Sequence, residues 1–96
     1  MGGYPEQSLK DVIAEQNPKA MLADGLDDCI LGIGYRCGHD PLAVYDYDAC
    51  VVMFMNRDGM TREDAIEWME FNVVGAGGEG YPIFLRLRDD IETRKL

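Results

Sequence analysis

Cys37 and His39 are the only cysteine and histidine that lie close together in this sequence, and Asp40 follows them. A thiolate beside an imidazole can act as a nucleophile, and the same two groups can bind a metal ion. A structural zinc site uses four ligands, usually in closely spaced cysteine pairs, and the spacing of Cys29 and Cys50 does not complete such a set. We therefore expect a surface turn here, with a Cys37/His39 enzyme as the weaker alternative.

Asp46-Tyr47-Asp48 has the spacing of a D-x-D motif, which holds Mg²⁺ or Mn²⁺ in some proteins. Acidic residues at these positions also suit the start of a helix, where a carboxylate accepts a hydrogen bond from a free backbone N–H. The cap accounts for Asp46 or Asp48 without an ion. We therefore predict a helix N-terminus at this point, with neither a metal nor a cofactor, and metal binding by Asp46 and Asp48 stays open as the weaker alternative.

Gly75, Gly77 and Gly80 match the letters of the dinucleotide-binding pattern G-x-G-x-x-G. That pattern works only where it follows a strand and opens a helix. Here it is expected to follow a helix and to open a strand. We interpret residues 75–80 as a connecting loop.

The net charge of −9 lies entirely between residues 20 and 85, which hold twelve acidic residues against three arginines. Such a field repels nucleic acids and anionic membranes, and it attracts basic protein surfaces. We expect a basic protein partner, no direct binding of nucleic acid and no membrane contact. The acidity also serves solubility, and that alternative stays open.

Three glutamates, Glu63, Glu67 and Glu70, follow one another at helical spacing and share one face, with no lysine between them. Like charges at this spacing destabilise an isolated helix by a few tenths of a kcal/mol each. The face is either simply solvated or docks on a basic partner. Our candidate partner-binding residues are these glutamates and four aspartates of the acidic central part of the chain: Asp24, Asp27, Asp28, Asp58, Glu63, Glu67 and Glu70.

The composition excludes several classes of protein. The longest unbroken apolar run, residues 49–55, is too short to cross a bilayer, and the N-terminus has no signal-peptide pattern. Three cysteines without disulfide-like spacing fit reduced thiols in a cytosol. We expect a cytoplasmic protein.

Hydrophobic patterning and turn signals predict the secondary structure of residues 1–45. A short helix is expected over residues 6–16, with Pro18 ending it. Residues 20–23 and 29–36 are interpreted as a β-hairpin with a loop of about five residues. Gly32 and Gly34 within its second strand indicate a bulge or a close approach. Residues 38–41 are expected to be a loop before a short strand at 42–45.

A helical hairpin is predicted in the middle of the chain. The apolar run 49–55 forms its first helix, Gly59 ends that helix, and Thr61 caps the second. Ala65, Met69 and Val73 form the buried stripe of the second helix, and Trp68 is expected in the core. Residues 81–87 read as a closing strand, followed by a charged tail that frays or forms a turn of helix.

These elements predict one α+β domain over residues 1–96. We expect a small, mostly antiparallel sheet of three or four strands packed against the helical hairpin, plus the short N-terminal helix. Residues 1–19 form the N-terminal helical segment, residues 20–87 the core module and residues 88–96 the charged tail.

Four segments carry a resemblance to known proteins, at residues 42–48 (LAVYDYD), 55–65 (MNRDGMTREDA), 70–76 (EFNVVGA) and 79–84 (EGYPIF). In these segments the chain resembles a group of small uncharacterised proteins encoded by phages and prophages. The resemblance implies a setting, not an activity, because no catalytic residue is assigned in that group. Phage proteins of this size often bind host proteins, and acidic ones include anti-CRISPR-like inhibitors of defence nucleases.

The resemblance and the charge together suggest a non-enzymatic phage protein that binds and inhibits a basic host protein, such as a nuclease or a CRISPR effector. A second hypothesis is a protein that sequesters a small molecule or nucleotide. Its pocket would lie beside Gly32, Gly34 and the Gly-rich loop, lined by Tyr35, Arg36 and Arg57. The sequence leaves a homodimer open.

Overall fold

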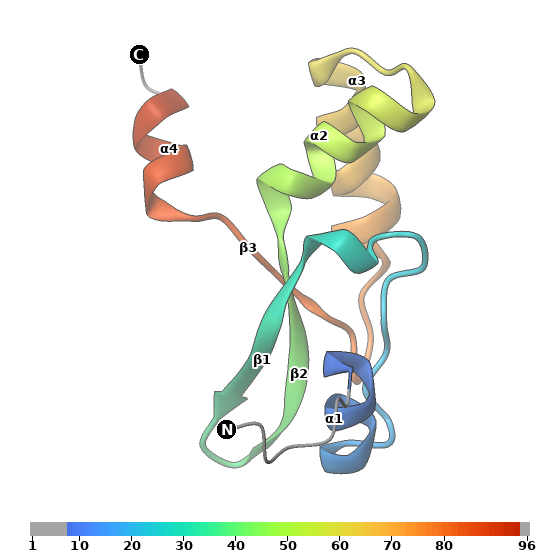
Figure 1. The fold of residues 1–96 in the computed structure, drawn as a ribbon, viewed down its shortest axis with the longest axis vertical. Coiled ribbons are helices and arrows are strands. Elements are labelled where there is room, and N and C mark those ends of the chain that lie inside the picture. Colours follow the sequence, from blue (N-terminus) through green and yellow to red (C-terminus); the bar gives the residue numbers. More distant parts are fainter. Residues whose placement is uncertain (1–7, 95–96) are drawn as a thin grey trace.

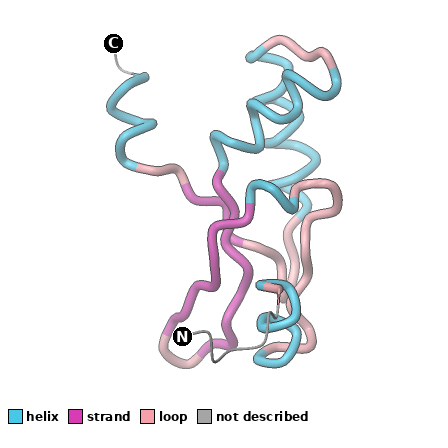
Figure 2. The backbone as a smooth tube through the Cα atoms, in the orientation of Figure 1, coloured by secondary structure: helices cyan, strands magenta, loops and turns pink. Residues whose placement is uncertain are grey.

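The computed structural model describes the backbone of residues 8–94 and the side chains of residues 8–91. It has an α+β fold in which a three-stranded sheet, ordered β1-β2-β3, is accompanied by helices (Figure 1). The strands are β1 (Ile30–Arg36), β2 (His39–Asp46) and β3 (Ile83–Leu85). Figure 2 shows the sheet as the link between the helices at its two ends. The predicted fold class is confirmed.

The helix α1 (Leu9–Gln16) lies beside β2, near the closed end of the β1–β2 hairpin (Figure 1). It starts after Ser8, whose hydroxyl oxygen accepts a hydrogen bond from the backbone N–H of Asp11. Its end agrees with the prediction, whereas residues 6 and 7 of the predicted helix lie outside the described residues. The buried side chain of Asn17 then donates a hydrogen bond to the carbonyl oxygen of Pro41 in β2.

The predicted pairing of residues 20–23 with the strand at residues 29–36 was wrong. Residues 20–23 form no strand; β1 pairs antiparallel with β2 across a two-residue turn at residues 37–38. The backbone N–H of Met21 instead bonds to the carbonyl oxygen of Gly80, so this segment lies along the loop before β3. A Cβ atom on Gly80 would lie 2.3 Å from the carbonyl oxygen of Lys19, which explains the glycine.

The predicted loop at residues 38–41 was also wrong, because β2 already begins at His39. Proline is disfavoured in a central strand because it cannot donate to a ladder. Pro41 is tolerated here because β3 pairs only with the far end of β2, from Val44 to Asp46. The register of the β1–β2 pair shifts beside Gly32 and Gly34, so the irregularity predicted at these glycines is confirmed.

The helical hairpin connects β2 to β3 and makes that strand pair parallel. A parallel pair requires a crossover connection, which is supplied by α2 (Tyr47–Asp58) and α3 (Arg62–Trp68). The chain then runs through a π-helical turn, η2 (Met69–Val73), and a 3₁₀ turn, η3 (Val74–Ala76). The helical hairpin predicted from the sequence is confirmed, and the charged tail forms α4 (Arg88–Arg94).

The hydrophobic core lies between the sheet and the helical hairpin. Tyr45 of β2 is fully buried, stacks on Phe84 of β3 at 5.5 Å between ring centroids, and accepts a hydrogen bond from the N–H of Ala23. Leu26, the residue before the 3₁₀ turn η1 (Asp27–Cys29), and Cys29 within that turn belong to the same core. Within the described residues, no helix is both long and apolar enough to cross a membrane.

Candidate partner-binding site

Local signals determine where α3 begins. Gly59 takes the left-handed conformation (φ 70°) that ends α2, and the Thr61 hydroxyl accepts a hydrogen bond from the N–H of Asp64 at 3.1 Å. Both features were predicted from the sequence. They place Glu63 and Asp64 in the first turn of α3, where acidic side chains interact favourably with the helix dipole.

The π-helical turn keeps the buried stripe of this segment aligned. Ala65, Met69 and Val73 are spaced by four residues, and each such step runs about 40° ahead on a regular helix of 3.6 residues per turn. A π turn holds more residues per turn and offsets that drift. All three side chains are buried, as predicted.

Trp68 is 44% exposed, so its predicted place in the core was wrong. Trp68 comes directly before the buried Met69, so its side chain points away from the fully buried face of the helix. Its ring contacts that of Phe54 in an edge-to-face arrangement, with 6.4 Å between the ring centroids. Phe71 is 74% exposed. Phe71 was not among the predicted site residues, although its position three residues after Trp68 places both rings on neighbouring faces.

Two hollows meet at Trp68 and Asn72, and together we call them the Trp68 groove. The first measures about 370 Å³ and lies between Met60, in the turn of the helical hairpin, and Phe71, with Asp64 and Glu67 on its border. The second measures about 340 Å³ and extends to Asp24 and Tyr81. The groove therefore brings Asp24 and Glu67, which are far apart in sequence, to one surface.

Three of the seven predicted site residues have partners within the fold. Asp27 forms an ion pair with Lys10 at 3.0 Å, and this contact raises the pKa of Lys10. Asp58 pairs with the neighbouring Arg57 at 3.3 Å. Glu70 accepts a hydrogen bond from the Tyr47 hydroxyl at 2.7 Å.

The other four acids are exposed: Asp24, Asp28, Glu63 and Glu67. Among the described side chains, none of the four has a hydrogen-bond or ion-pair partner. Of these, Asp24 and Glu67 border the Trp68 groove. The candidate site thus contains acidic side chains that none of the described side chains neutralises.

A second pair of hollows lies at the closed end of the β1–β2 hairpin. One of about 230 Å³ is lined by Gly34, Tyr35 and Arg36, among others, and one of about 350 Å³ reaches Lys19, Glu79 and Gly80. They share His39, Asp40 and Leu42. Arg57 is not among their lining residues; it donates to the carbonyl oxygen of Gly25 and covers the Phe54 ring.

Cys37 occupies the exposed hairpin turn, two residues before His39. No hydrogen bond joins the two side chains within residues 8–91. The remaining thiols, Cys29 and Cys50, are buried, and this burial raises the pKa of both. A raised pKa keeps a thiol protonated and unreactive.

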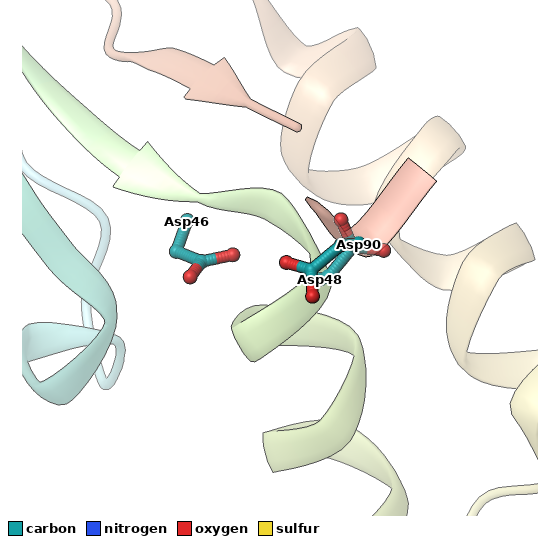
Figure 3. A group of neighbouring side chains, drawn as sticks. All are labelled: Asp46, Asp48 and Asp90. Carbon is teal, nitrogen blue, oxygen red and sulfur yellow. The ribbon is translucent and has the colours of Figure 1, made fainter. Parts of the chain in front are cut away.

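Three carboxylates, from Asp46, Asp48 and Asp90, lie within 4.8 Å of one another (Figure 3). Such a group resembles the oxygen ligands of a divalent cation. Asp46 accepts a hydrogen bond from the N–H of Ala49, which confirms the predicted helix cap, and buried Asp48 faces Arg86 at 3.4 Å. The cap and the ion pair account for both residues of the D-x-D motif.

Comparisons of the chain with protein-family models, with curated proteins and with solved structures gave no match. The choice of the Trp68 groove as the candidate site therefore rests on its exposed rings and on acids that have no partner among the described residues.

Proposed function

We propose that this protein is a non-enzymatic inhibitor that docks on a basic surface of a host nucleic-acid-handling protein. One observation carries the proposal: Trp68 and Phe71 are exposed beside carboxylates that lack partners among the described residues. Exposed aromatic side chains are costly to leave in water and are typical anchors of protein interfaces. The acids beside them select the charge of the partner.

The electrostatics favour a basic protein over a nucleic acid or an anionic membrane. The chain carries −9 overall, so its field accelerates encounters with positive surfaces and opposes binding to phosphates. A protein that handles DNA or RNA offers such a positive surface, shaped for a polyanion. An acidic helix on that surface would exclude the nucleic acid.

The host setting comes from the resemblance to phage and prophage proteins. In that setting the inhibitor acts in the cytoplasm of a bacterial host, against a nuclease or a CRISPR effector. Neither a cofactor nor catalysis is part of the proposed action. The partner supplies the chemistry, and this chain blocks it.

The test compares two double variants that remove the same charge from opposite ends of the molecule. Glu63→Gln/Glu67→Gln alters the exposed face of α3. Asp40→Asn/Glu79→Gln alters the closed end of the β1–β2 hairpin, which lies far from α3 (Figure 1). Each is used with the unaltered chain to capture proteins from a bacterial lysate. The captured protein is then assayed for inhibition of its nucleic-acid binding or cleavage.

We expect Glu63→Gln/Glu67→Gln, the α3 variant, to lose capture and inhibition. Asp40→Asn/Glu79→Gln should retain both. Capture should also weaken between about 0.1 M and about 1 M salt, as the Debye length falls from about 10 Å to about 3 Å. Salt-independent capture, or full inhibition by the α3 variant, would contradict the proposal.

The hollows at the hairpin end favour a second candidate, the binding of a small molecule or nucleotide. Tyr35 and Arg36, predicted to line such a pocket, border the hollow of about 230 Å³ beside Gly34, and Lys19 and His39 add positive or hydrogen-bonding groups. This candidate predicts a rise in melting temperature with nucleotides. The rise should be lost in Arg36→Gln, which removes a positive group that lines the hollow, and kept in Glu63→Gln/Glu67→Gln.

A further inference from the structure

Two aromatic rings of this protein each have the guanidinium of an arginine from the same chain lying over them. The guanidinium of Arg57 lies 5.3 Å from the centre of the Phe54 ring and pairs with Asp58. The guanidinium of Arg86 lies 5.6 Å from the centre of the Tyr47 ring and pairs with Asp48. In both places one cation contacts a ring and a carboxylate at once.

A third group of rings and carboxylates has no such cation among the described residues. Trp68 and Phe71 border the same hollow as Asp64 and Glu67. Among residues 8–91 no arginine or lysine lies over either ring, and neither carboxylate has an ion-pair partner. The rings attract a cation through their negative faces, and the carboxylates attract it through their charge.

We propose that Trp68, Phe71, Asp64 and Glu67 bind an arginine-bearing segment of the partner protein. The inference rests on the proposed function and names the chemistry of its partner. A guanidinium lies against the exposed rings, and its N–H groups bond to the carboxylates at the rim of the hollow. The hollow of about 370 Å³ also receives the apolar part of the arginine side chain.

Arginine fits this site better than lysine does. A guanidinium is planar, stacks on aromatic faces, pairs with a carboxylate through two N–H groups and is weakly hydrated. A lysine ammonium is a strongly hydrated point charge. A second copy of this chain is a poor occupant, because each copy carries −9 and the two acidic faces would repel.

The single tryptophan of the chain reports directly on this site. The full chain is titrated with two capped nine-residue peptides that differ only in having three arginines or three lysines among alanine and leucine. Binding is followed by Trp68 fluorescence, and sedimentation velocity measures self-association. The variants are Phe71→Ser, Glu67→Gln, and Tyr35→Ser as a control that removes a ring of similar exposure at the hairpin end.

We expect the arginine peptide to change the Trp68 emission and to bind about two- to five-fold more tightly than the lysine peptide, the range of an exposed cation–π contact. Phe71→Ser and Glu67→Gln should each weaken binding, and Tyr35→Ser should not. Circular dichroism of each variant confirms that a loss reflects the site and not unfolding.

Three outcomes overturn this inference. Equal binding of both peptides, with no effect of Phe71→Ser, leaves an acidic docking face without an arginine site, so the proposed function survives. An unchanged Trp68 emission with both peptides removes the site, and the capture experiment then decides the proposed function alone. Self-association that buries Trp68 makes a second copy the occupant.

Discussion

The hydroxyl of Tyr47 donates a hydrogen bond to the carboxylate of Glu70, with 2.7 Å between the two oxygens. Tyr47 is the first residue of α2, and Glu70 lies in the π-helical turn after α3. The bond therefore ties the start of the helical hairpin to its end. It also assigns Glu70 a structural role, so the glutamate face open to a partner consists of Glu63 and Glu67.

Tyr47→Phe tests this bond through the pH dependence of stability. Burial, and then the bond to Glu70, raise the pKa of Tyr47 to about 12. The unfolded chain loses this proton near pH 10, so unfolding becomes easier as pH rises from about 10 to about 12. Without the hydroxyl this contribution disappears, and stability falls less steeply over that range.

Urea unfolding at several values between about pH 9 and pH 11 measures the effect. Some fall remains in the variant because the pKa of Tyr45 and the pKa of Cys50 are also raised by burial. At neutral pH, Tyr47→Phe should lose about 1 kcal/mol, the contribution of one hydrogen bond. An identical alkaline slope in the variant and the unaltered chain would contradict the assignment.

Asp46→Ala tests the cap of α2. The Asp46 carboxylate accepts the N–H of Ala49 at 3.0 Å, and losing such a cap costs about 1 kcal/mol. Asp46→Asn keeps an oxygen acceptor and should keep most of the stability. The two variants are compared by urea unfolding at neutral pH. If both lose stability equally, the charge of Asp46, and not its cap, matters.

The sequence predicted the features that depend on neighbouring residues. Asp46 and Thr61 each stand before a helical run, and in the structure each accepts a hydrogen bond from a free backbone N–H of the first turn. Gly59 stands between the two runs and takes the left-handed conformation that ends α2. The helical hairpin follows from these signals. The acids without described partners, Glu63 and Glu67, were also found in this way, because helical spacing is a local property.

The pairing of the strands depends on distant residues and was not predicted. Residues 20–23 have the composition of a strand, but they lie along Gly80 instead. Nothing in their local pattern specifies that neighbour. The parallel direction of β3 follows from the crossover through α2 and α3, which a strand pattern does not encode. The exposure of Trp68 likewise depends on a core already filled by Met69 and Val73.

Gly34→Ala and Gly32→Ala form a matched pair within β1. A Cβ atom on Gly34 would lie 2.9 Å from Val44 Cγ2 and 3.4 Å from Ile83 Cδ1, whereas a Cβ atom on Gly32 meets nothing within 4 Å. The Val44 side chain is stiff because it branches at Cβ. Gly34→Ala should therefore cost about 1–3 kcal/mol, and Gly32→Ala should be tolerated.

Thermal and urea unfolding of the two variants measures this difference. A larger loss for Gly32→Ala than for Gly34→Ala would contradict the close approach of Val44 and Ile83 to Gly34.

Met69→Ala and Phe71→Ser test which face of the π-helical turn is buried. Met69 is fully buried, and truncating such a side chain costs about 2–5 kcal/mol because it removes contacts and leaves a cavity. Phe71 is 74% exposed, so its substitution should change the free energy of unfolding by less than about 0.5 kcal/mol. Both values come from urea unfolding at neutral pH. If Phe71→Ser costs as much as Met69→Ala, Phe71 belongs to the core, and the Trp68 groove loses a ring on which the proposed partner binding depends.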